Sequence, residues 1–170
     1  FNIINKIAII SSIIFFHLLP FLIKIDRKKL FSNFKKQIKL IISLVVFYFL
    51  TINNFNFSLE FGGGGFFYKL SYILTKTDYL FLVIYFVSLL FIFIIADKKI
   101  NNYILIIIFI IMNPQLSIYH KYYDPLVLLT FILFFDHGIF KKKLLQNNMI
   151  IILFLYTMFF NLSYVLRNYI

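Results

Sequence analysis

The sequence predicts an all-α protein, a polytopic bundle of about six transmembrane helices. Its composition, its uncharged runs and the placement of its basic residues lead to this fold class. Hydrophobic residues make up 62% of the 170 positions and charged residues only 14%, whereas about a quarter of a soluble domain is charged. The absence of Cys excludes a disulfide-stapled secreted domain. With only 5 Gly and 3 Pro, a collagen-like or Pro-rich chain is excluded as well.

Six runs without a charged side chain are the predicted membrane helices. They cover residues 7–23, 40–59, 79–96, 100–119, 125–135 and 144–166. Most approach the roughly 20 residues that a helix needs to cross the bilayer core. They are apolar on all faces and lack the alternation of a barrel strand, which favours helices. The run 125–135 would rise only about 16 Å as a helix, so it spans only if it extends toward Phe140 or begins near Tyr119.

Basic residues concentrate in alternate connections between these runs. Seven lie in the loop 24–39, two are Lys98 and Lys99, and three are Lys141 to Lys143, out of 17 in the chain. The positive-inside rule places these connections in the cytoplasm. The segments 53–78 and 113–124 are then external loops, and we expect an integral protein of the bacterial inner (plasma) membrane. The single transmembrane domain 1–170 begins at Phe1 rather than Met and on the external side, so we expect a fragment of a larger protein.

The formal net charge of +11 does not indicate a nucleic-acid partner, because the Lys residues flank helices as topology signals do. The stretch "KIDRKKLFSNFKKQIKL" in the cytoplasmic loop 24–39 has a basic amphipathic pattern. It suits anionic lipid headgroups, and a solvated loop that only sets the topology is the alternative. Membrane lipids are therefore the expected partners.

The first external loop contains a glycine run directly after the single Glu of the chain. Gly62, Gly63, Gly64 and Gly65 follow Glu60 with one Phe between. Glycines adopt positive backbone dihedrals and let amide N–H groups approach a phosphate or sugar. The run is thus a candidate substrate contact, and a flexible bend into the headgroup region is the alternative. Glu60 is a candidate catalytic acid, or else a solvated carboxylate.

The second external loop has the densest group of polar side chains, in the motif "HKYYDP" of residues 120–125. Lys121 is a candidate phosphate ligand and Tyr122 or Tyr123 a candidate stacking partner for a sugar. The imidazole of His120 and the carboxylate of Asp124 complete the candidate substrate-binding group. The structural alternative is an ordinary helix start, with Asp124 as N-cap before a first-turn Pro. The first interpretation predicts a substrate site and the second a structural role, and both place the motif at a membrane boundary.

His17 lies inside the first apolar run, where a polar group is costly and tends to face the bundle interior. A proton relay or a substrate contact is one interpretation. A buried His beside a kink at Pro20 is the other, because the run contains no acidic partner.

The spacing of the histidines gives no metal motif. His17, His120 and His137 are scattered and Cys is absent, so no metal ligand is predicted from spacing. A divalent ion held by Glu60, Asp78 or Asp124 is the alternative, and the cofactor stays open.

The segment "YHKYYDPLVLLTFILFF" resembles the late region of polytopic GT-C type membrane glycosyltransferases, where a His/basic/Tyr cluster precedes a transmembrane helix. The resemblance implies transfer of a sugar from a polyprenyl-phosphate-linked donor on the non-cytoplasmic face, usually with inversion. It also implies that His120, Lys121 and Tyr122 hold the donor headgroup. The key acid of that family follows its first helix in an external loop that has no counterpart here. The catalytic base is therefore unidentified, with Glu60 as the candidate for orienting an acceptor hydroxyl.

Two other functions agree with the sequence, so enzymatic activity is left open. A transporter or flippase-like carrier fits His17, the fourth run broken at Pro114 and the glycine bend. A non-catalytic subunit of a membrane complex fits the apolar composition alone.

Overall fold

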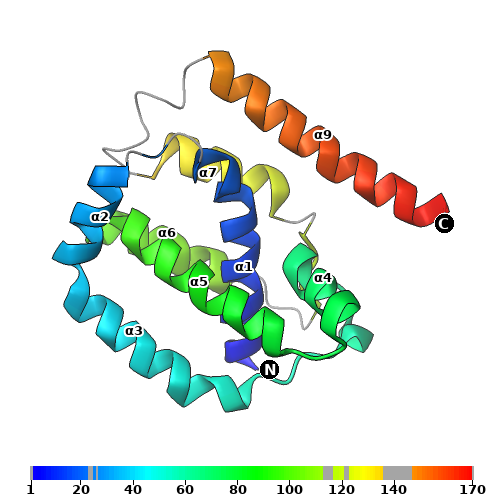
Figure 1. Cartoon of the computed structure of the whole chain (residues 1–170), viewed down its shortest axis with the longest axis horizontal. Helices are drawn as coiled ribbons and strands as arrows, with labels where there is room; N and C mark the ends of the chain where they lie inside the picture. The colour runs from blue at the N-terminus through cyan, green and yellow to red at the C-terminus, as the bar shows by residue number, and fades with distance from the viewer. Residues whose placement is uncertain are drawn as a thin grey trace.

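The computed structural model of the chain (Figure 1) describes residues 2–22, 25, 27–112, 117–120, 123–135 and 147–169. Within these ranges the regular structure is helical, and the only strand-like pairing is an isolated bridge between Gly63 and Ile118. The predicted all-α class is confirmed.

Most helices overlap the uncharged runs of the sequence, whereas two form in the predicted loops 24–39 and 53–78. The described helices are α1 (Ile3–Leu22), α2 (Arg27–Lys36), α3 (Ile38–Thr51), α4 (Gly65–Thr75), α5 (Tyr79–Ala96), α6 (Ile100–Ile111), α7 (Asp124–Leu133) and α9 (Asn147–Tyr169), with 3₁₀ turns η1 (Ile52–Asn54) and η2 (Leu59–Phe61). The two in the predicted loops are α2 and α4. The match is closest for α5, whose bounds are those of the uncharged run 79–96. Its last residue is Ala96. The next residue, Asp97, has a left-handed φ of 50°, which terminates the helix.

Helix α1 occupies the centre of the bundle. It packs against α4, α5, α6, α7 and α9, and Figure 1 shows the other helices arranged around it. Every residue from 8 to 14 is buried, which is nearly two full turns. A helix that is apolar on all faces must be covered on all faces, and here protein supplies most of that cover.

Two helices, α1 and α5, are long and apolar enough to cross a membrane. Helices α2 and α3 would form a third span only as a broken pair, because they meet at an angle of 74°. The described residues thus provide two or three candidate spans, fewer than the expected six. The uncharged runs predicted longer helices than the structure contains here. Helix α6 ends at Ile111 after 12 residues, and α7 has only 10. They rise about 18 and 15 Å, against a bilayer core of about 30 Å.

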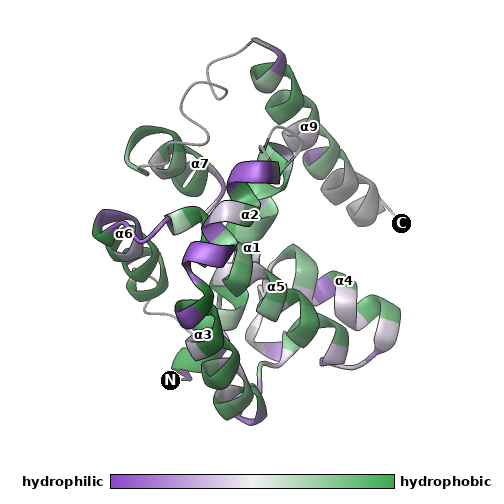
Figure 2. Cartoon of the chain, turned by 60° about the vertical axis from the view of Figure 1, so that its left-hand side comes forward, coloured by the Kyte–Doolittle hydropathy of each residue, from purple (hydrophilic) through white to green (hydrophobic). Residues whose placement is uncertain are grey.

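The surface of the bundle is strongly apolar, as Figure 2 shows in green along α3, α5, α6 and α9. Leu50, Ile111 and Phe159 are 73%, 69% and 75% exposed. A soluble monomer rarely exposes large contiguous apolar patches. The surface and the two apolar helices are therefore compatible with an integral membrane protein.

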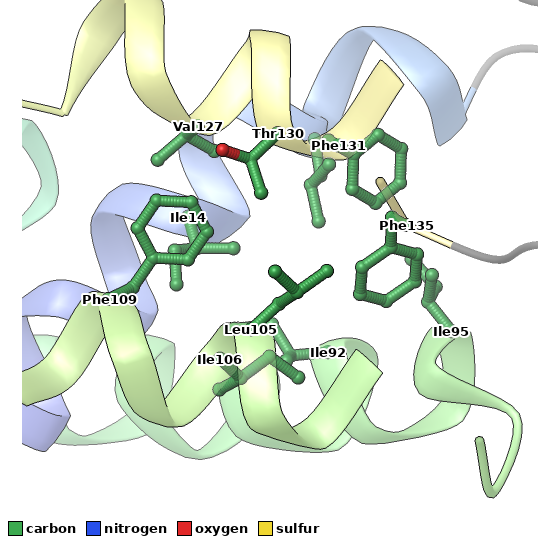
Figure 3. Close-up of a pocket in the computed structure, with 11 residues that line it drawn as sticks. Ile14, Ile92, Ile95, Leu105, Ile106, Phe109, Val127, Thr130, Phe131 and Phe135 are labelled. Atoms are coloured by element: carbon green, nitrogen blue, oxygen red, sulfur yellow. The ribbon is translucent and has the colours of Figure 1, made fainter. Parts of the chain in front are cut away.

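The interior between α1, α5, α6 and α7 is nearly filled. A cavity of about 20 Å³ remains there, lined by apolar side chains and Thr130 (Figure 3). One water would fit, but water needs two or more polar partners. The cavity is therefore a packing defect of the core and too small for a substrate.

Candidate functional site

The glycine run joins the two predicted external loops. All four glycines have positive φ, between 73° and 83°, which side chains disfavour. The amide of Gly64 donates a hydrogen bond of 2.8 Å to the carbonyl oxygen of Ile118. A Cβ on Gly63 would lie 2.1 Å from that oxygen. The run is therefore a closely packed turn that holds the segment leading to His120, and its predicted contact with substrate stays a prediction.

Three side chains from distant parts of the sequence meet next to this segment. The Oδ1 of Asp124 lies 3.0 Å from the Nε2 of His17 and 3.3 Å from the Nε2 of His120. The His17 side chain is 5% exposed, that of His120 10% and that of Asp124 36%. We call these three residues the His–His–Asp cluster.

Local structure explains why Asp124 is available to the two imidazoles. Helix α7 begins at Asp124, its N-cap residue is Tyr123, and Pro occupies the first turn. The predicted helix start is thus confirmed, but Asp124 is not the N-cap that the sequence predicted. Its carboxylate lies in the first turn, where the helix dipole favours negative charge. It therefore faces His17 and His120 rather than the backbone of α7.

Aromatic rings enclose the cluster on the side of α4 and α9. The His120 ring lies 4.8 Å from the Phe16 ring and 5.0 Å from the Phe160 ring, measured between centroids. Phe66 of α4 contacts Phe16 with a centroid distance of 5.0 Å. The hydroxyl of Tyr156 donates a 2.9 Å hydrogen bond to the carbonyl oxygen of Phe16, which ties α9 to α1 beside the cluster. These rings exclude water and leave the imidazoles in an apolar surrounding.

The polar atoms of the cluster are close to one another but not hydrogen-bonded. His17 Nε2, both ring nitrogens of His120 and Asp124 Oδ1 are buried and make no hydrogen bond of acceptable geometry. Distances of 3.0 and 3.3 Å satisfy an ion pair, whereas the ring N–H directions do not satisfy a hydrogen bond. The two contacts are therefore not hydrogen bonds, because a hydrogen bond requires alignment as well as a short distance. Buried polar atoms without such partners are uncommon and call for an explanation.

The cluster lies deeper than the sequence predicted. His17 is the fifteenth residue of the 20-residue α1, about 21 Å along the axis from Ile3. It is also only five residues, about 8 Å, before the C-terminal end of α1 at Leu22, so Asp124 and His120 lie beside the half of α1 that is nearer the basic loop 24–39. Non-helical backbone is tolerated at such depth only when protein or a water-filled cavity surrounds it. Ile118 is 1% exposed, so the segment that carries His120 meets this condition.

The predicted site residues have different outcomes. The structure brings His120 and Asp124 together, and it adds His17, whose acidic partner comes from another element. Glu60 is exposed on η2 and does not belong to the cluster. Lys121, Tyr122 and His137 lie outside the described residues, as does the break around Pro114. His17 was detectable only as the one titratable group in the middle of an apolar run.

The cluster is also a set of metal-ligating groups. Its two imidazole nitrogens and carboxylate oxygen lie within 4.8 Å of one another. Of the carboxylates proposed as ligands of a divalent ion, Asp124 belongs to this set. Sequence spacing gave no sign of it, because the three residues are contributed by α1, α7 and the segment before α7.

No family model matches the chain, and neither a curated protein nor a solved structure matches it. The functional argument therefore depends on the site itself.

Proposed function

We propose that the chain is a membrane glycosyltransferase-like protein that transfers a sugar from a polyprenyl-phosphate-linked donor on the non-cytoplasmic face. The observation that carries the proposal is the His–His–Asp cluster. Two of its members, His120 and Asp124, belong to the segment that resembles GT-C type enzymes. The cluster is enclosed by aromatic rings, which suit the apolar faces of sugars.

The reaction would require few groups from the protein. The hydroxyl oxygen of the acceptor forms a bond to the anomeric carbon of the donor sugar. The bond from that carbon to the phosphate oxygen breaks, and polyprenyl phosphate leaves with the electron pair. The hydroxyl proton passes to a base. The Asp124 carboxylate, the one carboxylate of the cluster, is the candidate for that base. General-base catalysis by such a group contributes about 10²- to 10⁴-fold.

The proposal includes the six-run topology and an inner-membrane location. Helices α6 and α7 would lie in the membrane as partial spans, joined by the buried segment that leads to His120. The basic connections would then face the cytoplasm, and a donor from the opposite leaflet would have to enter the bundle along most of α1, because His17 lies five residues before Leu22. Lys121 and Tyr122 retain their proposed role at the donor headgroup.

A transfer assay tests the enzyme proposal. The complete protein in detergent would be incubated with a radiolabelled polyprenyl-phosphate sugar, and product would be compared for wild type, Asp124→Asn, His120→Ala and Lys121→Ala. We expect Asp124→Asn to lose about 100-fold or more in rate. Asp97→Asn is the matched control, because Asp97 lies at the C-terminal end of α5 and outside the cluster. Transfer at the wild-type rate by all three site variants would remove the proposed site.

A carrier is the second candidate, and one observation favours it specifically. The short helices α6 and α7 are separated in the sequence by a connection whose Ile118 is 1% exposed, and Asp124 at the start of α7 lies 3.0 Å from His17. Discontinuous helices and intramembrane charge are typical of transporter binding sites. A carrier would move a labelled substrate across a vesicle membrane without forming a covalent product. Detection of a new glycosidic bond in the assay above would favour the enzyme.

A further inference from the structure

We propose that His17, His120 and Asp124 bind one divalent transition-metal ion, with zinc as the ion that best suits the ligands. The inference deepens the proposed function and rests on it only for the role of the ion. Binding itself is a separate property that can be measured without turnover.

The donor set matches zinc chemistry. Two imidazole nitrogens and one carboxylate oxygen form the three-ligand set of many catalytic zinc sites, in which the fourth position stays open. Ca²⁺ and Mg²⁺ prefer oxygen ligands, so two imidazoles argue against both. Imidazole binds a metal through a ring nitrogen, and each of the two histidines places one ring nitrogen beside the Asp124 carboxylate.

The distances agree with a shared ion. Two ligands that each lie about 2.0–2.1 Å from a tetrahedral zinc ion are about 3.3 Å apart. The carboxylate oxygen lies 3.0 and 3.3 Å from the two imidazole nitrogens. All three ligand atoms lie within 4.8 Å of one another. Side-chain adjustments of less than 1.5 Å would therefore bring the pair of imidazoles to the tetrahedral separation.

The lack of aligned hydrogen bonds supports the same conclusion. The His17 side chain is 5% exposed, and its Nε2 lies 3.0 Å from Asp124 Oδ1 without forming a hydrogen bond. Asp124 Oδ1 and His120 Nε2 are also buried without a hydrogen bond. Leaving buried polar atoms unsatisfied costs about 1–3 kcal/mol each. One ion coordinated by the three atoms would satisfy all of them.

The ion would also explain how an anionic donor approaches Asp124. A lipid-linked phosphate would be repelled by the carboxylate. A dication changes the sign of the local field. Its open position suits a phosphate oxygen, so the chemical class of the ligand would be a phosphate monoester or diester of a lipid.

Metal binding can be measured directly on the complete protein. Wild type purified in detergent and freed of metal with a chelator would be titrated with Zn²⁺ by calorimetry, and bound metal counted by mass spectrometry. We expect one ion per chain. Co²⁺ in place of Zn²⁺ should give the intense visible absorption of a four-coordinate site, which requires no variant. A substoichiometric metal content and the absence of that absorption would overturn the inference.

Variants locate the ion. His17→Gln and Asp124→Asn should each weaken Zn²⁺ binding by at least the 10- to 100-fold that follows loss of an outer-shell partner. Asp97→Asn should bind as wild type does. Thermal unfolding and helical content would be recorded for each variant, so that a misfolded variant is recognised. Wild-type affinity in both folded cluster variants would contradict the assignment.

The outcomes of the two proposals are distinguishable. Stoichiometric Zn²⁺ binding without sugar transfer by the loaded protein would overturn the proposed function and leave the metal site standing. Transfer by a protein that binds no Zn²⁺ would overturn the metal site and leave the transferase standing.

Discussion

His17 and Asp124 form a close pair, with 3.0 Å between Nε2 and Oδ1, although they come from opposite ends of the chain. The pair places a titratable histidine of the central helix against the first turn of α7. It gives a polar residue that is costly inside an apolar run a carboxylate neighbour in the candidate site. The sequence supplied both residues, and the packing of α7 against α1 brought them together.

Gly63→Ala should destabilise the protein more than Gly62→Ala. Both positions have positive φ, 78° and 73°, so both variants carry a backbone penalty of about 1–3 kcal/mol. The new Cβ at position 63 would in addition meet the backbone oxygen of Ile118 at 2.1 Å. The Cβ at position 62 meets the hydroxyl at the end of the Tyr119 side chain, which can move. Thermal unfolding in detergent measures the difference, and equal melting temperatures would argue against the tight loop contact.

Tyr156→Phe should loosen α9 from α1. The substitution removes the 2.9 Å hydrogen bond from the Tyr156 hydroxyl to the carbonyl oxygen of Phe16. A lost bond that leaves a buried acceptor unpaired costs about 1–3 kcal/mol. Tyr79→Phe is the matched control, because Tyr79 is 77% exposed. Hydrogen exchange or limited proteolysis near α9 should increase in the first variant only. The same increase in both would show that the tie is not specific.

Cys introduced at Ser32 and at Glu60 should be labelled from opposite sides of the membrane. The chain has no native Cys, and both positions are exposed. Ser32 lies on the basic helix α2 and Glu60 precedes the glycine run. A membrane-impermeant thiol reagent applied to intact cells should therefore label Glu60→Cys but label Ser32→Cys only after lysis. Labelling of both from one side would contradict the proposed orientation.

Much of the helical structure followed from local sequence. The uncharged run 79–96 predicted α5 with the same bounds, and the Asp-Pro pair at 124–125 predicted the start of α7. The number of spans did not follow, because a run without charge can contain the end of a helix, as at Ile111 and Thr51. Helix ends depend on backbone partners and packing that hydropathy does not report.

The site was predicted in part. His120 and Asp124 were identified because titratable groups are rare in this chain. His17 was left with a structural interpretation, since its own run contains no acid. The glycine run was predicted as a bend or a ligand contact. Its role in holding the Ile118 segment depends on a contact between two loops that sequence distance conceals.

The sequence by itself determined that this chain is helical and apolar on most faces. Hydropathy follows from residue type alone, and long runs with few Gly or Pro residues favour helices. It also determined where charge collects along the chain. Only the tertiary structure decided that α1 is central and that His17, His120 and Asp124 converge. The physical reason is that burial and contact depend on the packing of α1, α4, α7 and α9 around one another. That arrangement is a property of the whole chain and not of any one segment.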